Sequence, residues 1–474
     1  MPILPKDRNF APEKHICIKY AAYSIQSYNF NPYTMIKKIT LISLLLTGGF
    51  TVSHAQQRTE ASQSLSIEQL FHLIETNSTS LRKQKSGVEA AQLGIESAKS
   101  KRLPDLNVSL SLSYIGNALL TDRDFTNVHG LSSPHLGNDF SLQAQQAVYT
   151  GGALSSGIRM AELGKEIAQT GVTLTRQQIR FIAIGQYLDL FKVDNRIQVY
   201  NKNIELTQKL IADIKEKQSQ GMALKNDITR YELQMESLKL GLTALRNNRN
   251  ILNHQLCNTL GLSTDTYIQP DTTLTNLTYG KDGEAHWQSQ GSSLSPRLQL
   301  SNLNIQMAQQ KERLAKSDML PKVALVASNN FNGPILFELP PIDKNLNVWY
   351  VGVGVKYDLS SLFKSNKRIK QARIETRQSQ EAKAEENEQL NNDIQAAYVQ
   401  YLQTYVELET QQKSVELAQQ NYDVINNRYL NQLALITDMI DASNIRLNAE
   451  LQEVDARINI VYAYYRMKFV AGEI

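Results

Sequence analysis

The sequence contains very little cysteine and, over most of its length, no long hydrophobic run. Beyond residue 55, no stretch of about 18 apolar residues occurs, so the sequence predicts no transmembrane helix there. The only cysteines are Cys17 and Cys257, and only Cys257 lies beyond residue 55. A chain processed near that point would therefore have no intramolecular disulfide.

The sequence also lacks an excess of one charge. Its 50 Lys and Arg residues nearly balance 46 Asp and Glu residues, which gives a formal net charge of +4. No block of basic residues stands out. Because nucleic acid binding depends on concentrated positive charge, we expect no nucleic acid partner.

No group of residues points to catalysis. The 7 histidines are scattered, without a pair at metal-ligand spacing. Gly152 and Gly157 have the spacing of a phosphate-binding loop, but Ile158 replaces the required lysine. Asp438 and Asp441 lie one helical turn apart, without a nearby nucleophile, and a solvated helix face explains them equally well. We expect no enzyme activity, no cofactor and no metal.

Residues 35–55 have the pattern of a secretory signal peptide. Two lysines precede an apolar stretch, and residues 53–55 (Ser-His-Ala) form a small-x-small cleavage signal. Translation from Met35 would leave residues 1–34 as an upstream extension, whereas translation from Met1 would give a long leader. Either start predicts export, and no cysteine follows the cleavage point to carry a lipid anchor.

Two long segments of the chain share one pattern. A helical pattern ends at a Leu-Pro step at Pro104, and another ends at a Leu-Pro step at Pro321. Each continues through a strand, a loop, a second strand, a long helix, a break and a further helix. An internal repeat of this length predicts two copies of one structural unit. We place the copies at residues 56–262 and 294–474, with a linker over residues 263–293.

The expected strands alternate between apolar and polar residues, in pairs within residues 105–149 and 321–358. A soluble sandwich would explain one such strand, but aromatic residues at both ends of an apolar row are typical of membrane barrels. Four strands are too few to close a barrel, and open edges are not tolerated in lipid. Closure therefore requires several copies of the chain. The apolar rows are Leu106, Val108, Leu110 and Leu112, and Trp349, Val351, Val353, Val355 and Tyr357.

The helical patterns place apolar residues at spacings of three and four over long distances. One runs over residues 153–220 and resumes after Gly221, and the second copy repeats this arrangement. Such a period predicts coiled-coil packing. At about 1.5 Å per residue, residues 153–220 would form a helix roughly 100 Å long. The predicted helix over residues 66–103 is about half as long, as is the one after Gly221, so the two would stack end to end beside it.

The signal peptide, the duplicated helix–strand–strand–helix–helix unit and the Leu-Pro steps together resemble TolC-like outer-membrane efflux proteins, over about residues 60–472. The resemblance implies a mainly α fold with β: long antiparallel coiled-coil helices and four strands per chain. It also implies a homotrimer, closed as a twelve-stranded β-barrel and an α-helical tunnel. The implied function is a passive exit duct in the outer membrane, with a large periplasmic portion, for a tripartite efflux pump or a type I secretion system.

The resemblance is sharpest at the two turns between paired helices. It implies partners there: a periplasmic adaptor docked on the turns and, beyond it, an inner-membrane transporter. The second turn lacks glycine and has Gln432 in its place; because Asn tolerates the left-handed conformation, an Asn431-Gln432 turn is feasible. The expected docking residues are Gly221, Met222, Ala223 and Leu224 in the first turn, and Leu433, Ala434 and Leu435 in the second.

The same resemblance implies a gate at this end of the tunnel. Asp438 and Asp441 match its acidic residues, and Tyr429 and Asp227 match two partners in the network that holds it shut. The usual arginine is replaced by Ala434, which predicts a weaker or different latch. Two other classes stay open: a periplasmic coiled-coil adaptor, which would lack paired barrel strands, and a soluble structural coiled coil, which the signal peptide and strand pairs argue against.

Overall fold

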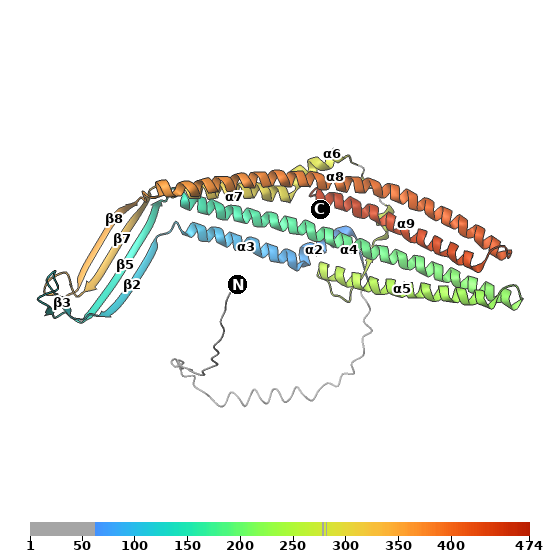
Figure 1. The fold of residues 1–474 in the computed structure, drawn as a ribbon, viewed down its shortest axis with the longest axis horizontal. Coiled ribbons are helices and arrows are strands. Elements are labelled where there is room, and N and C mark those ends of the chain that lie inside the picture. Colours follow the sequence, from blue (N-terminus) through green and yellow to red (C-terminus); the bar gives the residue numbers. More distant parts are fainter. Residues whose placement is uncertain (1–61, 277–278, 281) are drawn as a thin grey trace, which may run out of the picture. The chain divides into compact units, whose positions relative to one another are not determined.

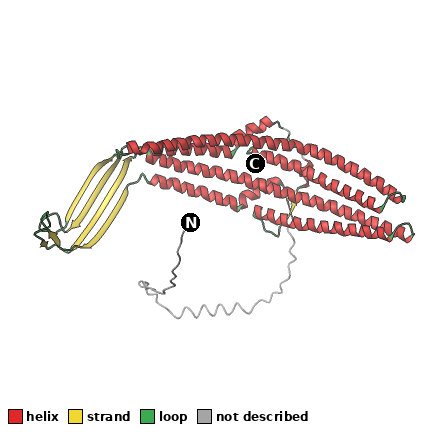
Figure 2. Cartoon of the chain, in the orientation of Figure 1, coloured by secondary structure: helices red, strands yellow, loops and turns green. Residues whose placement is uncertain are grey.

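The computed structural model describes residues 62–276, 279–280 and 282–474. The predicted signal peptide lies outside the described residues. The fold described below is that of the unit Glu60–Ile474. The described residues are mainly helical, at 68%, and they contain one four-stranded and two two-stranded sheets (Figure 2). No helix in the described residues has the length and apolar character needed to cross a membrane.

The helix predicted over residues 66–103 is in fact two helices, α2 (Ile67–Asn77) and α3 (Thr79–Ser100). Ser78 separates them with an extended backbone, at φ −62° and ψ 119°, and its hydroxyl accepts a hydrogen bond from the Leu81 amide at 3.4 Å. A run of Thr, Asn and Ser surrounds this position. Such side chains compete for backbone hydrogen bonds and favour helix caps, so the helix stops and restarts here.

Two very long helices run the length of the helical part, as predicted from the spacing. Along each of them, two half-length helices follow one another: α3 and α5 pack against α4, and α7 and α9 pack against α8 (Figure 1). The two sets also contact one another, mainly because α4 packs against α7 and α9. The bounds are α4 (Ala153–Ser219), α5 (Lys225–Leu260), α7 (Pro296–Ser317), α8 (Ser361–Leu430) and α9 (Ile436–Val470).

The segment predicted as a linker, residues 263–293, contributes to the largest apolar core. Ile268 and Trp287 are buried there, together with Tyr187 of α4. The Tyr187 hydroxyl donates to the Leu65 carbonyl and accepts from the Asp271 amide, which connects three distant parts of the chain. The elements concerned are β1 (Ser62–Leu65), which pairs in parallel with β6 (Tyr267–Pro270), a 3-10 segment (Thr272–Asn276) and α6 (Glu284–Leu294).

The four-stranded sheet is antiparallel throughout, in the order β2-β5-β7-β8. Its central strands come from the two halves of the chain, and β2 and β8 have no strand partner on their outer edges among the described residues. A small hairpin of β3 (Ala118–Leu120) and β4 (His129–Leu131) lies in the segment predicted as a loop. The sheet strands are β2 (Asp105–Tyr114), β5 (Leu136–Tyr149), β7 (Lys322–Gly333) and β8 (Leu346–Lys356).

The register of this sheet separates an apolar face from a polar one. Val108 pairs with Leu142 on one face, whereas Ser109 pairs with Ser141 on the other, with their hydroxyl oxygens 2.9 Å apart. Following the pairing across the sheet places Val351 on the same face as Val108. The apolar face is open to solvent in a single chain, since Val351 is 73% exposed. The two apolar rows predicted from the sequence therefore share one uncovered face.

Candidate functional site at the hairpin turns

The turns that join α4 to α5 and α8 to α9 lie together at the end of the helices opposite the larger sheet (Figure 1). They have the same backbone hydrogen bonds. The Met222 amide donates to the Lys217 carbonyl at 2.9 Å, and the Leu433 amide donates to the Arg428 carbonyl at 2.8 Å. Each bond closes the last turn of the preceding helix, in the manner of a Schellman motif. The two turns are thus equivalent structures built from different residues.

Both turns depend on one residue in the left-handed conformation. Gly221 has φ 76° and Gln432 has φ 60°. The sequence suggested that Asn431 would provide this conformation, but Asn431 has φ −95°, and its side-chain amide donates to the Asn427 carbonyl at 2.8 Å. Gln432 therefore has the left-handed backbone conformation, which glycine adopts at the lowest energetic cost.

Asp227 and Asp438 occupy equivalent places after the turns. Their carboxylates accept hydrogen bonds from the amides of Leu224, at 3.2 Å, and Leu435, at 3.0 Å. A carboxylate in the first turn of a helix satisfies a free amide and interacts favourably with the helix dipole. Asp438, expected as a gate residue, thus has a structural role as a cap. Asp441 is exposed one turn later, and its side chain has no hydrogen bond or ion pair within the described residues.

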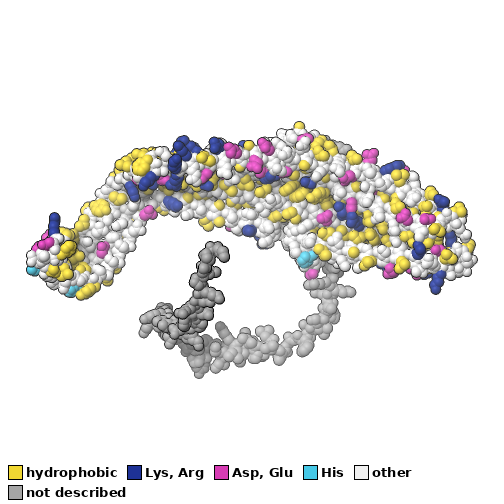
Figure 3. Space-filling model, in the orientation of Figure 1, with side chains coloured by type: hydrophobic (Ala, Val, Ile, Leu, Met, Phe, Trp, Pro, Cys, Tyr) yellow, Lys and Arg dark blue, Asp and Glu magenta, His cyan; other side chains and the backbone are white. Residues whose placement is uncertain are grey.

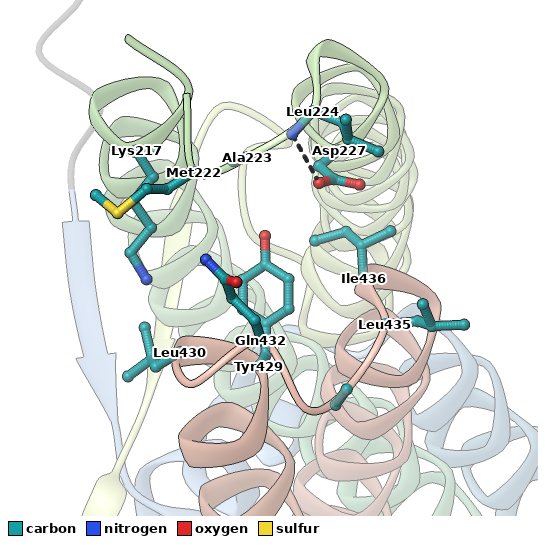
Figure 4. Close-up of a pocket in the computed structure, with 11 residues that line it drawn as sticks. Lys217, Met222, Ala223, Leu224, Asp227, Tyr429, Leu430, Gln432, Leu435 and Ile436 are labelled. Atoms are coloured by element: carbon teal, nitrogen blue, oxygen red, sulfur yellow. Dashed lines mark hydrogen bonds between the residues drawn. The ribbon is translucent and has the colours of Figure 1, made fainter. Parts of the chain in front are cut away.

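A cleft of about 230 Å³ lies between the two turns and brings together Tyr429 and Asp227 (Figure 4). Burial raises the pKa of the Tyr429 hydroxyl, and the negative charge of Asp227 acts in the same direction. The Lys217 ammonium lies 5.9 Å from the centre of the Tyr429 ring. Gln432 of the second turn also lines the cleft, as does Lys217, which sequence reasoning missed.

The tips of the turns expose large apolar side chains. Leu224, Leu433 and Leu435 are each 69% exposed, and Met222 is 50% exposed. Ala223 instead packs against the apolar cluster beneath, which contains Ile214, Tyr231 and Met439 among its buried residues. Gly221 is exposed, and Ala434 is half-buried beside the cleft. Exposed leucines supported from below by a packed cluster are suited to contact with another protein.

A buried polar layer lies below this cluster and was not anticipated from the sequence. Arg446 is only 5% exposed; its guanidinium lies 3.9 Å from the Tyr422 ring centre and donates to the Asn203 side chain. Asn203 in turn donates to the Glu450 carboxylate at 3.0 Å. Met439 and Arg446 are seven residues apart, the coiled-coil repeat, so the heptad could have revealed the arginine as a core residue. Polar groups at such positions fix the register of packed helices.

Comparison with known proteins relates this fold to that of outer-membrane channel subunits. Residues 288–473 match the family of outer membrane efflux proteins. No curated protein sequence matches the chain. Groups of His, Cys, Asp or Glu able to hold a metal ion do not occur in the part of the chain that the structure describes.

Several solved channel structures share the fold. VceC from Vibrio cholerae superposes with a TM-score of 0.70 at 14% identity, covering 86% of this chain and 96% of VceC. CusC gives a TM-score of 0.73 at 14% identity, covering 86% and 92%. CmeC from Campylobacter jejuni gives 0.68 at 13% identity, covering 86% and 85%. The resemblance to TolC-like outer-membrane efflux proteins is thus confirmed, and the fold does not favour a periplasmic adaptor.

Proposed function

We propose that this chain forms the exit duct of a tripartite efflux pump or a type I secretion system, located in the outer membrane. The observation that carries the proposal is the exposed apolar face of the four-stranded sheet. Burying such a face against lipid is favourable, while the opposite face of serine, asparagine and glutamine side chains can border water. This sheet is therefore the membrane-embedded part.

The unpaired edges of β2 and β8 support assembly as a homotrimer. In lipid, every backbone N–H and C=O needs a partner, so β8 of one chain would pair with β2 of the next. Three chains would close a twelve-stranded barrel. The shared element order, α3-β2-β5-α4-α5 and α7-β7-β8-α8-α9, supports two copies of one ancestral unit in each chain.

The hairpin turns would then lie at the periplasmic end of an α-helical tunnel. Their exposed leucines would dock the helical tips of an adaptor protein, which would connect the duct to an inner-membrane transporter. The transporter would supply the energy, so the duct itself would be passive.

The same end would contain the gate. Three copies of Asp438 and Asp441 would form two rings of carboxylates and favour cations in the passage. Tyr429 would contribute a hydroxyl for a hydrogen bond between neighbouring hairpins. Replacing Tyr429 with Phe should then raise the resting conductance in planar bilayers, whereas Tyr462→Phe, a change far from the turns, should not.

Cell fractionation tests the proposal directly. The expressed chain should be found in the outer membrane as a heat-modifiable trimer, and the purified trimer should form ion-conducting channels in planar bilayers. Recovery of a soluble monomer would reject both the barrel and the duct.

A further inference from the structure

A positively charged cleft lies where the larger sheet meets the beginning of α8, far from the hairpin turns. Lys and Arg side chains gather over this junction (Figure 3). The cleft has a volume of about 380 Å³, and its cations come from the strands β7 and β8 and from the helix α8. They are Lys322 of β7, Lys356 of β8, and Lys364 and Arg368 of α8.

Two of these lysines lie side by side, although their like charges repel. Lys322 pairs directly with Lys356 in the register of β7 and β8, so both side chains leave the sheet on the same face. Like charges directly opposite one another destabilise a sheet. Their face is the polar one, which also presents the paired residues Ser328 and Tyr350. Folding alone does not account for such a pair.

The acidic residues of the cleft neutralise it only in part. The Asp318 carboxylate contacts Arg368 at 2.7 Å and Lys322 at 4.0 Å. The Asp358 carboxylate accepts hydrogen bonds from the Ser360 amide, at 3.0 Å, and the Ser360 hydroxyl, at 2.7 Å. Four cations against two carboxylates, all lining one cleft, leave two positive charges.

The beginning of α8 adds to this positive potential. Ser360 and Ser361 line the cleft, and α8 begins at Ser361. The amides of Ser361 and Leu362 donate to the carbonyls of Asp358 and Leu359, so this end attracts anions through the helix dipole and not through free amides. The cleft therefore combines flexible ammonium groups, a guanidinium and a helix N-terminus, which are the groups that bind oxyanions in proteins.

We propose that this cleft binds the phosphate, carboxylate or sulfate group of an exported solute. Its place along the passage rests on the proposed function: if the polar face of the sheet borders the lumen, three clefts ring the passage between barrel and tunnel. An anionic solute would then meet a site of opposite charge there. This assigns anionic compounds to the cargo of the duct.

The test is binding of citrate, a tricarboxylate, to the full purified chain, measured by isothermal titration calorimetry at low ionic strength. Lys356→Gln combined with Lys364→Gln should weaken the binding by about tenfold, since each removes a charge-assisted contact. The matched control combines Lys367→Gln with Lys370→Gln, two exposed lysines on the same part of α8 that do not line the cleft. The control should change the affinity less than about twofold. Circular dichroism verifies that both variants fold.

Equal effects of the two double variants would overturn the proposal, because citrate would then respond only to surface charge. So would binding of phosphatidylglycerol vesicles through these lysines without binding of citrate, since the cleft would then serve lipid headgroups. Conductance separates this proposal from the duct itself. If the cleft variant loses citrate binding, the anion site is supported. If the wild-type protein also forms no channel, the proposed duct is rejected while the site stands.

Discussion

Gln432 has the same left-handed backbone conformation as Gly221, at φ 60° and φ 76°. A side chain in this region is strained by about 1 kcal/mol, a strain that glycine avoids. Gln432→Gly should therefore raise the free energy of unfolding by about 0.5–1 kcal/mol, measured by urea denaturation. The control is Gly221→Ala, which meets no atom within 4 Å and should destabilise through the backbone alone. A loss of stability in Gln432→Gly would show that the glutamine side chain contributes more in the cleft than its backbone costs.

Tyr231 should make stability sensitive to alkaline pH. Burial raises the pKa of its hydroxyl, and Tyr422 and Tyr429 act in the same direction. The folded chain then holds this proton to higher pH than the unfolded chain, whose tyrosine has a pKa of about 10. Ionisation of Tyr231 therefore leaves the free energy of unfolding unchanged below about pH 10 and lowers it as the pH rises above that value.

Tyr231→Phe should flatten this alkaline decline in thermal unfolding experiments. At neutral pH it should be neutral or stabilising by about 1 kcal/mol, because within the described residues the buried hydroxyl has no hydrogen-bond partner. Tyr279→Phe is the contrasting change. Its hydroxyl donates to the Leu274 carbonyl at 2.9 Å, so it should destabilise at neutral pH. Destabilisation by both changes would mean that Tyr231 has a partner in the assembled protein.

The two aspartates of the proposed gate should differ in role: Asp441 should act through its charge alone, and Asp438 should also act as a helix cap. Asp441→Asn should lower cation preference in planar bilayers without changing stability. Asp438→Asn should lower cation preference too, and because Asn also accepts hydrogen bonds, α9 should keep its start. Asp438→Ala should additionally cost about 1 kcal/mol of stability. If the Asn double variant keeps the wild-type selectivity, both aspartates belong to an ordinary solvated helix face.

The two faces of the sheet should tolerate charge unequally. Val353 lies on the apolar face and Ser111 on the polar face, and both are exposed in a single chain. Val353→Arg should cost about 2–4 kcal/mol if its position is near the bilayer midplane. It should therefore reduce the trimer recovered from the outer membrane, whereas Ser111→Arg should be better tolerated. The opposite ranking would reverse the assignment of lipid and lumen.

Leu435→Asp should abolish export while the trimer stays intact, because a charge replaces an apolar contact at the tip of the second turn. Leu240→Asp provides the control: it lies on α5, away from the turns, and its 72% exposure matches the 69% of Leu435. Crosslinkers placed at position 435 should capture an adaptor in cells, and crosslinkers at position 240 should not. Capture at neither position, with export intact in Leu435→Asp, would remove the docking role.

The long-range features of the fold were accessible from the sequence because each rests on a pattern sustained over many residues. Apolar spacing gave α4 to within a residue of its observed bounds, Ala153–Ser219. Alternation gave the faces of β2 and β8. Features that depend on a few residues were not predicted. Ser78 interrupts a helical pattern with a single helix cap, and the strands β3 and β4 are too short to show a periodic pattern.

The sequence predicted which residues form the candidate site better than it predicted how they are arranged. The turns and their aspartates follow from local sequence, but the choice of Gln432 over Asn431 for the left-handed position depends on which carbonyls the preceding helix leaves free. The association of Tyr429 with Asp227 joins residues about 200 positions apart, which only packing of the two hairpins can bring together. Arg446 was overlooked because a charged residue does not belong to an apolar stripe by type, although it does by position.

The open edges of β2 and β8 also bear on how the protein reaches its final state. A single chain can form its helices and the three strand pairings inside the sheet, but no other strand of the described residues pairs with the two outer strands. In the proposed trimer, the last step of maturation is then an encounter between molecules. Its rate should rise with the concentration of chains, and at low expression the half-finished subunit, with an apolar sheet and two reactive edges, becomes the species that periplasmic chaperones and proteases must handle.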